Sequence, residues 1–271
     1  MDRSDLVTTD VERAVHAIRS GGLAAIPTET VYGLAADATN PDAVARIFAV
    51  KGRPADHPLI VHIPSAVHLD EWAAPPTPAA ARILIDAAWP GPLTVIVPRA
   101  SGVLDVVTGG LDTVGLRVPA HRVALELLES VGVGLAAPSA NRFGAVIPTT
   151  AEHVLRDLGE RLDPRRDVIL DGGSCPIGVE STIVDCASTP PQILRAGGIA
   201  VEDIQRLLAG DVADASGPSR ASGMLASHYA PRCAVRLVDS PDDAMALRAG
   251  TIGADVLDLT DDLVTYAREL Y

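Results

Sequence analysis

Polar side chains at one turn near the N-terminus are suited to bind a small polar ligand. The segment PTETVYGL (residues 27–34) follows the short apolar run LAAI, so Thr28, Glu29 and Thr30 come where that predicted strand ends. In open α/β sheets, ligand groups bind preferentially beside such strand ends. The threonine hydroxyls can bind a ligand there, or they can simply cap the turn.

A lysine and an arginine separated by one glycine close the next predicted helix. Lys51 is a point charge and Arg53 a planar fork, a combination that suits the oxygens of a polyphosphate. Cations at a helix C-terminus also favour the helix dipole, so a structural role is the alternative. His57 and His62 follow and can equally be structural, because no third ligand at metal-binding spacing accompanies them.

Three further polar groups interrupt apolar strands later in the chain. Arg117 lies within TVGLRVP, where a buried arginine needs an anionic partner, either a protein carboxylate or a ligand carboxylate. APSAN places Ser139 and Asn141 after another apolar run, and CPIGVESTIVD places Glu180 and Ser181 before one. With the turn at Thr28–Thr30, the last two motifs make three polar strand ends, and we expect these three to share one cleft.

Composition restricts the class of protein. The 271 residues carry 22 Lys+Arg against 35 Asp+Glu, a net charge of -13 that opposes bulk electrostatic binding of nucleic acid. No apolar run reaches the roughly 20 residues of a membrane span, and the acidic start does not resemble a signal peptide, so we expect a cytoplasmic protein. Cys175, Cys186 and Cys233 form no CxxC pair and are expected to be small buried thiols. The usual glycine-rich nucleotide fingerprints are absent from the sequence.

The elements that position these residues alternate between strands and helices. Such alternation predicts an α/β fold, a twisted mixed sheet flanked by helices, followed by a linker and a small C-terminal α/β remnant. The expected helices span about 11–18, 41–51, 79–88, 121–131, 152–158 and 201–209, and the expected strands span 23–26, 58–63, 93–97, 113–118, 134–137, 167–170, 181–185 and 192–195.

Six motifs in order, PTETVYGL, KGRPADHPLIVHI, GLRVP, PSAN, GVESTIVD and ILRAGG, resemble the YrdC-like family of threonylcarbamoyl-AMP synthases. The resemblance implies a catalytic domain over 8–208, a linker or lid over 209–232 and a shortened C-terminal domain over 233–271. The linker segment SGMLASHYAP is similar to that of the two-domain subtype. Its His228 and Tyr229 could cover a nucleotide, and a passive tether is the alternative.

The resemblance implies an enzyme that forms threonylcarbamoyl-AMP and pyrophosphate from L-threonine, bicarbonate and ATP, for the t6A modification of tRNA. Mg²⁺ would be carried with ATP, and no protein-held metal is implied. The product would pass to a downstream tRNA threonylcarbamoyl transferase, with no membrane and no direct stable nucleic-acid binding involved.

Roles carry over by position from the family's motifs. The resemblance implies that threonine contacts Thr30, His62, Arg117, Ala137 and Ser181, with Arg117 paired to its carboxylate. It implies that the nucleotide contacts Lys51, Arg53, His57, Thr113, Ser139, Asn141, Arg195 and Tyr229, and that Lys51 and Arg53 are catalytic. His57 stands where the family often has asparagine and Ile147 where serine is usual, so no contact is carried to Ile147.

Two rival functions remain open from the sequence. A related carbamoyl or adenylyl transferase could use the same domain, although Arg117 with Thr30 and Ser181 favours an amino-acid acceptor. The second rival is an RNA-binding module. The net charge of -13 and an aromatic content of only 3% argue against it.

Overall fold

The computed structural model describes residues 3–216 of the chain. Its helices are α1 (Val11–Arg19), α2 (Pro41–Lys51), α3 (Ala79–Ala88), α4 (Asp105–Thr108), α5 (Arg122–Val131), α6 (Ala151–Leu158) and α7 (Val201–Leu208), with 3₁₀ turns η1 (Arg3–Leu6) and η2 (Ala66–Glu71). Its strands are β1 (Val7–Thr8), β2 (Ala24–Ile26), β3 (Gly33–Asp37), β4 (Ile60–His62), β5 (Leu93–Pro98), β6 (Thr113–Arg117), β7 (Leu135–Ala136), β8 (Val168–Leu170), β9 (Thr182–Asp185), β10 (Gln192–Arg195) and β11 (Ala213–Asp214).

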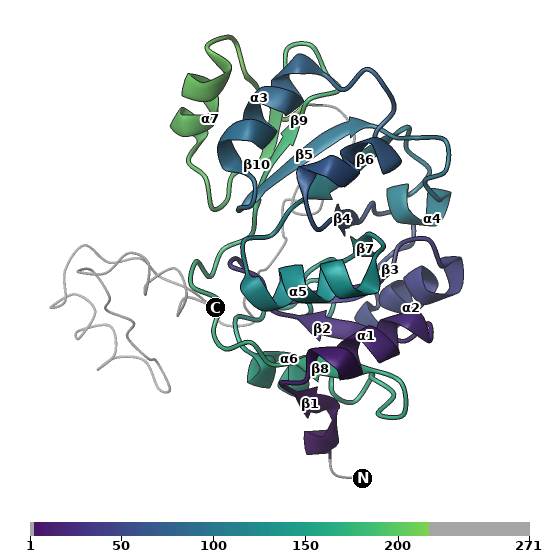
Figure 1. Ribbon diagram of the computed structural model, residues 1–271. Helices are drawn as coiled ribbons and strands as arrows, with labels where there is room; N and C mark the ends of the chain where they lie inside the picture. Colours follow the sequence, from purple (N-terminus) through teal and green to yellow (C-terminus); the bar gives the residue numbers. More distant parts are fainter. Residues whose placement is uncertain (1–2, 217–271) are drawn as a thin grey trace, which may run out of the picture.

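The strands form one mixed sheet with helices packed along it (Figure 1). Its order is β1-β8-β2-β3-β7-β4-β6-β5-β9-β10-β11, and it contains both parallel pairs, such as β4 with β6, and antiparallel pairs, such as β5 with β6. The predicted fold, a twisted mixed sheet flanked by helices, is therefore confirmed for the described residues. The predicted remnant over 233–271, the linker beyond residue 216 and Tyr229 lie outside them.

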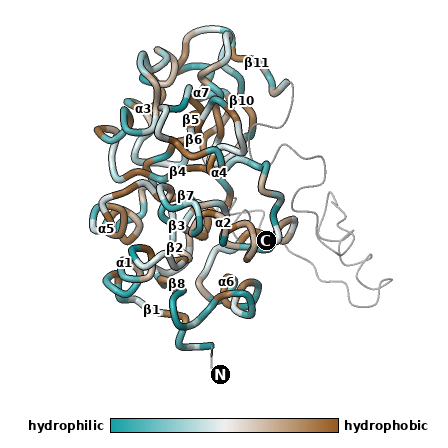
Figure 2. The backbone as a smooth tube through the Cα atoms, turned by 90° about the vertical axis from the view of Figure 1, so that its right-hand side faces the viewer, coloured by the Kyte–Doolittle hydropathy of each residue, from teal (hydrophilic) through white to brown (hydrophobic). Residues whose placement is uncertain are grey.

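The centre of the sheet is buried on both faces. Along β2 and β3, Ala24, Ile26 and Ala35 pack with α1 and α5, whereas Ala25 and Leu34 pack with the opposite core that includes α2 and α6. Figure 2 shows α1 and α5 on one side of these strands, α2 and α6 on the other, and hydrophobic backbone concentrated between them. Alternate side chains of a strand point to opposite faces, so small apolar residues let helices approach from both sides.

Local sequence sets the limits of α2, the helix that delivers Lys51. Asn40 caps its N-terminus by accepting hydrogen bonds from the backbone N–H groups of Asp42 and Ala43, and Pro41 occupies the first turn. Gly52 ends it in the left-handed conformation with φ 65°, which glycine adopts without steric cost. Lys51 and the segment after it are therefore held at a defined helix end.

One central strand was not predicted. Residues 33–37 follow the turn PTETVY and consist of Gly, Leu, two Ala and Asp, without the β-branched residues typical of strands. In the structure they form β3, which pairs antiparallel with both β2 and β7.

No helix among residues 3–216 is long and apolar enough to cross a bilayer.

Candidate active site

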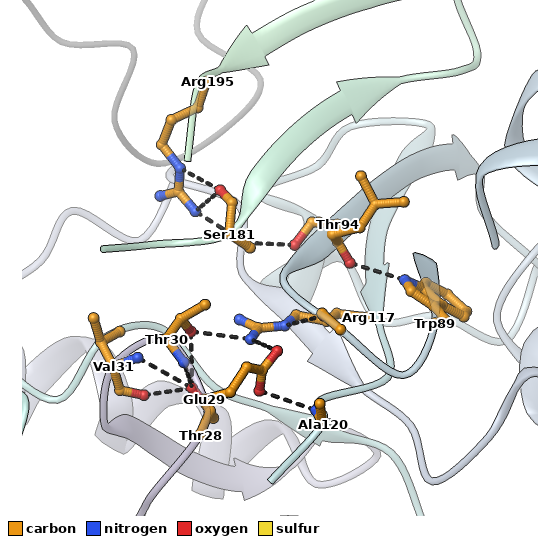
Figure 3. A network of polar contacts seen from close by, with 12 residues as sticks. Thr28, Glu29, Thr30, Val31, Trp89, Thr94, Arg117, Ala120, Ser181 and Arg195 are labelled. Atoms are coloured by element: carbon orange, nitrogen blue, oxygen red, sulfur yellow. Dashed lines mark hydrogen bonds and ion pairs between the residues drawn. The ribbon is translucent and has the colours of Figure 1, made fainter. Parts of the chain in front are cut away.

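The three polar strand ends meet at a single pocket. Thr28 and Thr30 come from the turn between β2 and β3, Ser139 follows β7, and Glu180 and Ser181 precede β9; all of them line the pocket. Figure 3 shows the threonine turn, Arg117 and Ser181 facing one another across it. The expectation of one shared cleft is thus met by the geometry.

The residues that the family resemblance assigns to threonine are also gathered there. Each of them lines this pocket: Thr30, His62, Arg117, Ala137 and Ser181. They come from five separate segments at or beside strands of the sheet. β4 and β6 are parallel neighbours, with His62 in register with Arg117. The fold therefore brings this set together, while its role in binding stays a prediction.

Arg117 is held by a protein carboxylate, which answers one of the questions left open by the sequence. Its Nη2 donates to Glu29 Oε1 at 2.6 Å and to Thr30 Oγ1 at 3.0 Å, and its Nε donates to the Gly91 carbonyl at 3.2 Å. Glu29 Oε2 accepts a hydrogen bond from the Ala120 N–H at 2.9 Å. These bonds use Nε and Nη2, whereas Nη1 has no hydrogen-bond partner among residues 3–216. Because Arg117 lines the pocket, Nη1 can serve an anionic ligand.

The two threonines of the turn have different hydrogen-bond partners and therefore different roles. Thr28 Oγ1 donates to the Val31 carbonyl at 2.7 Å and accepts from the N–H groups of Thr30 and Val31 at 3.2 Å. Thr28 therefore caps the turn, which is the structural alternative that the sequence left open for the threonines. Thr30 Oγ1 instead lies between Arg117 and Thr28, at 2.8 Å from Thr28 Oγ1, and faces the pocket.

Arg195 holds Ser181 in place. Its Nε and Nη2 donate to the Ser181 carbonyl at 3.1 and 2.9 Å, Nη2 reaches Ser181 Oγ at 3.1 Å, and Nη1 pairs with Glu180 Oε2 at 2.6 Å. An irregularity in the pairing of β10 with β9, between Ile193 and Arg195, aims this side chain. On its other side, Ser181 Oγ lies 2.8 Å from Thr94 Oγ1.

Lys51 ties the end of α2 to the loop after β7. Its Nζ donates to the Ser139 carbonyl and, at 2.6 Å, to the Asn141 carbonyl. Burial, with a smaller contribution from Arg53, lowers the pKa of Lys51 to about 7. Arg53 is itself buried and donates from Nη2 to the Pro58 carbonyl at 3.0 Å. Both cations expected to meet phosphate thus also have partners in the protein.

A second cavity, of about 570 Å³, opens beside Lys51. Its size falls within the range of roughly 300–1,000 Å³ that is usual for small-molecule pockets. Arg142, Phe143, Ile147 and Arg161 are among its lining residues, and Arg142 is paired with Asp157 at 2.6 Å. The cavity is therefore a cationic space with apolar walls, a combination suited to an anionic ligand with an apolar part.

The residues expected at the nucleotide are more dispersed than those expected at threonine. Ser139 and Arg195 line the first pocket and Lys51 lines the second cavity. The remaining described ones line neither: Arg53, His57, Thr113 and Asn141. Tyr229 lies outside the described residues. The structure therefore supports no single nucleotide cradle by itself.

Burial shifts the pKa values of two histidines near the site and of two cysteines toward the neutral forms. Burial, reinforced by Arg117, lowers the pKa of His62 to about 3, so its imidazole is neutral at physiological pH. Burial and then Arg53 lower the pKa of His57, whose ring packs edge-on against Phe143 with centroids 5.4 Å apart. Cys175 and Cys186 are free and buried, and burial raises the pKa of each thiol to about 12, so both act as small apolar side chains.

Sequence reasoning missed Thr94. It lies in the apolar run LTVIV, and its side chain is fully buried on β5. A hydroxyl in a strand that is otherwise apolar was the available signal, because a buried hydroxyl requires a partner. The partner, Ser181, is 87 residues away in the chain and became visible only with β9 placed beside β5.

Comparison with known proteins supplies the family. Residues 16–197 match the Sua5/YciO/YrdC family, described as telomere recombination, and residues 199–271 match the threonylcarbamoyl-AMP synthase C-terminal domain. The boundaries 8–208, 209–232 and 233–271 expected from the resemblance stay predictions.

Relatives and a solved structure agree with these matches. Threonylcarbamoyl-AMP synthase of Pyrococcus abyssi is 46% identical over 83% of this chain and 67% of its own length, and that of Bacillus subtilis is 42% identical over 88% and 70%. A crystal structure of P. abyssi Sua5 complexed with L-threonine aligns with a TM-score of 0.84 at 40% identity, covering 96% of this chain and 83% of that one. This chain therefore belongs to the Sua5/YciO/YrdC family, in its two-domain form with a threonylcarbamoyl-AMP synthase C-terminal domain.

Proposed function

We propose that this chain is an L-threonylcarbamoyladenylate synthase that forms threonylcarbamoyl-AMP and pyrophosphate from L-threonine, bicarbonate and ATP. The observation that carries the proposal is the single pocket lined by Thr30, His62, Arg117, Ala137 and Ser181. The named relatives, which share more than two fifths of their aligned residues, support it. A cytoplasmic location and transfer of the product to a tRNA threonylcarbamoyl transferase belong to the same proposal.

In this pocket threonine's carboxylate would meet Arg117. Nη1 is available for it, while Glu29 fixes the direction of the guanidinium through Nη2. The hydroxyls of Thr30 and Ser181 are the neighbouring groups able to bind the rest of the amino acid. The free volume of the pocket is about 30 Å³. Because this volume is small, we expect the side chains that line the pocket to shift when threonine binds.

ATP would lie between the pocket and the cavity beside Lys51, with Lys51 and Arg53 near its phosphates. Lysine and arginine side chains carry no oxygen ligands, so Mg²⁺ would be held chiefly by phosphate oxygens and water. When bound, the ion neutralises part of the phosphate charge. Lys51 and Arg53 would stabilise the negative charge on the departing pyrophosphate.

The reaction requires little covalent participation by the protein. Threonine's amine and bicarbonate give a carbamate and water, and a carbamate oxygen then attacks the α-phosphorus while pyrophosphate leaves. Neither step needs a protein nucleophile, and the buried thiols of Cys175 and Cys186 are unsuited to be one. Positioning of the reactants therefore supplies most of the rate.

The test is a pyrophosphate-release assay with purified protein, ATP, Mg²⁺, bicarbonate and L-threonine. We expect release that depends on threonine and that stops when bicarbonate is removed or Mg²⁺ is chelated. Equal release without threonine would contradict the proposal and favour a related transferase. The adenylate itself should be identified by mass spectrometry of the quenched mixture.

A further inference from the structure

Thr94 lies beneath the proposed threonine pocket without lining it. It is 0% exposed and sits on β5 between β6, which contributes Arg117 to the pocket, and β9, which directly follows Ser181 of the pocket. On one side Val95 pairs with Leu116 of β6, which places Thr94 beside Arg117 one residue on. On the other side Thr94 pairs with Ile183 of β9. Figure 3 shows Thr94 beside Ser181 and close to Arg117.

The hydrogen bonds around Ser181 leave its hydroxyl proton available to donate a hydrogen bond into the pocket. Thr94 Oγ1 has one partner among residues 3–216, Ser181 Oγ at 2.8 Å, so a buried Thr94 hydroxyl satisfies its donor by donating there. Arg195 Nη2, which is only a donor, also reaches Ser181 Oγ at 3.1 Å. With two donors on its oxygen, Ser181 has both acceptor sites filled. Its O–H therefore points away from both donors, as a hydrogen-bond donor to the pocket.

Thr94 is not needed to hold the backbone at this point. The start of β9 is fixed by the Thr182 N–H, which donates to the Pro92 carbonyl at 2.9 Å. Thr182 Oγ1 adds two bonds to Ile199, donating to its carbonyl at 2.7 Å and accepting from its N–H at 3.0 Å. The contribution of the Thr94 hydroxyl is therefore orientation of the Ser181 hydroxyl rather than anchoring of the strand.

We infer that Thr94 is a positioning residue for threonine binding, which it promotes by fixing the Ser181 hydroxyl as a donor to an acceptor oxygen of the amino acid. The inference rests on the proposed function and adds to it a residue that does not touch the substrate. The carboxylate of threonine is the strongest acceptor within the ligand, so it is the group that such a donor favours.

The experiment compares Thr94→Val with Thr94→Ser in the full chain. Valine keeps the shape and the branching at Cβ but removes the hydroxyl, whereas serine keeps the hydroxyl. We expect Thr94→Val to weaken threonine binding about 2- to 12-fold, the range that one neutral hydrogen bond represents. Calorimetric titration without ATP measures this, and KM for threonine should rise while KM for ATP stays unchanged. Thr94→Ser should restore threonine binding to within about twofold of wild type.

A double-variant cycle tests whether Thr94 acts through Ser181. In a Ser181→Ala background, Thr94→Val should weaken threonine binding no further. Thr77→Val is the matched control, because Thr77 is also buried but lines neither cavity. If valine packs badly at this position, Thr94→Ala provides the same test. Its effect on threonine binding is then measured in the wild-type and Ser181→Ala backgrounds.

Several outcomes would overturn the inference. They are unchanged threonine affinity in Thr94→Val, an equal loss in the Ser181→Ala background, or a fall in melting temperature with no change in threonine affinity. The proposed function is tested separately with the wild-type protein. If it neither binds threonine nor releases pyrophosphate with it, the proposed function fails and this inference fails with it.

Discussion

At the scale of single residues, Arg117 combines two tasks that substitution can separate. Arg117→Met removes the proposed partner of threonine's carboxylate and should weaken threonine binding by about 2–4 kcal/mol. It also leaves the buried Glu29 carboxylate without its cation, which should destabilise the fold by about 3–5 kcal/mol. Calorimetric titration and thermal unfolding measure the two effects independently.

Adding Glu29→Gln to Arg117→Met should recover stability without recovering threonine binding, since no uncompensated charge remains. Arg46→Met is the matched control, because Arg46 pairs with the fully buried Asp167 at 2.8 Å and lines neither cavity. It should lower stability and leave threonine affinity unchanged. Normal threonine binding by Arg117→Met would reduce Arg117 to half of a structural ion pair.

Lys51 should take up a proton when ATP binds. Burial lowers its pKa to about 7, so at pH 8 the free protein holds it mostly neutral. Phosphate oxygens nearby would favour the charged form and raise that pKa. Titrating ATP with Mg²⁺ at pH 8 in buffers of different ionisation enthalpy should therefore show proton uptake in wild type, which Lys51→Met abolishes. Identical heats in all buffers would place the phosphates elsewhere.

Without ligand, the same group makes stability depend on pH. The folded pKa of about 7 lies below the ordinary value of 10.5, so the unfolded chain binds more protons between these values. Stability from this residue therefore rises with pH across that window, and its cost is greatest below pH 7. Lys51→Met should flatten this part of the stability profile, as urea unfolding at several pH values would measure.

At the scale of elements, the segment after β10 sets the position of the segment before β9. A Cβ at Gly197 would lie 2.3 Å from the Glu180 carbonyl oxygen and 2.5 Å from the Ser181 carbonyl carbon, which are backbone atoms that have to move. Gly197→Ala should displace this wall of the pocket and lower kcat/KM for threonine by about 10- to 100-fold. Gly102→Ala, where nothing lies within 4 Å, is the control. Wild-type kinetics in Gly197→Ala would show that the wall tolerates the shift.

Elements that are determined by neighbouring residues in the sequence could be predicted, whereas elements that depend on distant partners could not. The start of α2 follows from Asn40 and Pro41 alone, so its position could be predicted within a residue. β3 could not, because its small residues become a strand through pairing with β2 and β7. The polar strand ends of the pocket were visible as motifs. The bonds of Thr94 and Lys51 were not, since their partners lie about 90 residues away.

At the scale of the whole molecule, a strongly acidic chain has to gather its useful cations locally. The net charge of -13 disfavours phosphate-bearing partners at long range. Beyond the Debye length of about 8 Å in physiological salt, however, surface charge is largely screened. Lys51 and Arg53 are both buried, so a ligand that reaches them interacts with these charges in a less screened environment. The overall charge is therefore compatible with a polyphosphate substrate.

The described part of the chain ends at Ser216 and contains the pocket proposed for threonine. Among residues 3–216, those that line the threonine pocket fall between Thr28 and Arg195, and the buried core residues fall between Leu6 and Ile204. A chain of residues 1–216 should therefore unfold cooperatively and bind threonine within about twofold of wild type. It should lose most threonine-dependent pyrophosphate release, because it lacks Tyr229, which the family resemblance assigns to the nucleotide.

Two further variants separate the contribution of Tyr229 from that of the residues after Pro231. Tyr229→Ala should reproduce the loss while keeping the rest of the chain, and deletion after Pro231 should leave synthesis largely intact because Tyr229 is retained. Full activity of residues 1–216 would show that the nucleotide is bound without the segment beyond Ser216. A loss on deletion after Pro231 equal to that of Tyr229→Ala would instead assign a part in the reaction to residues 232–271, which match the C-terminal domain of the synthases.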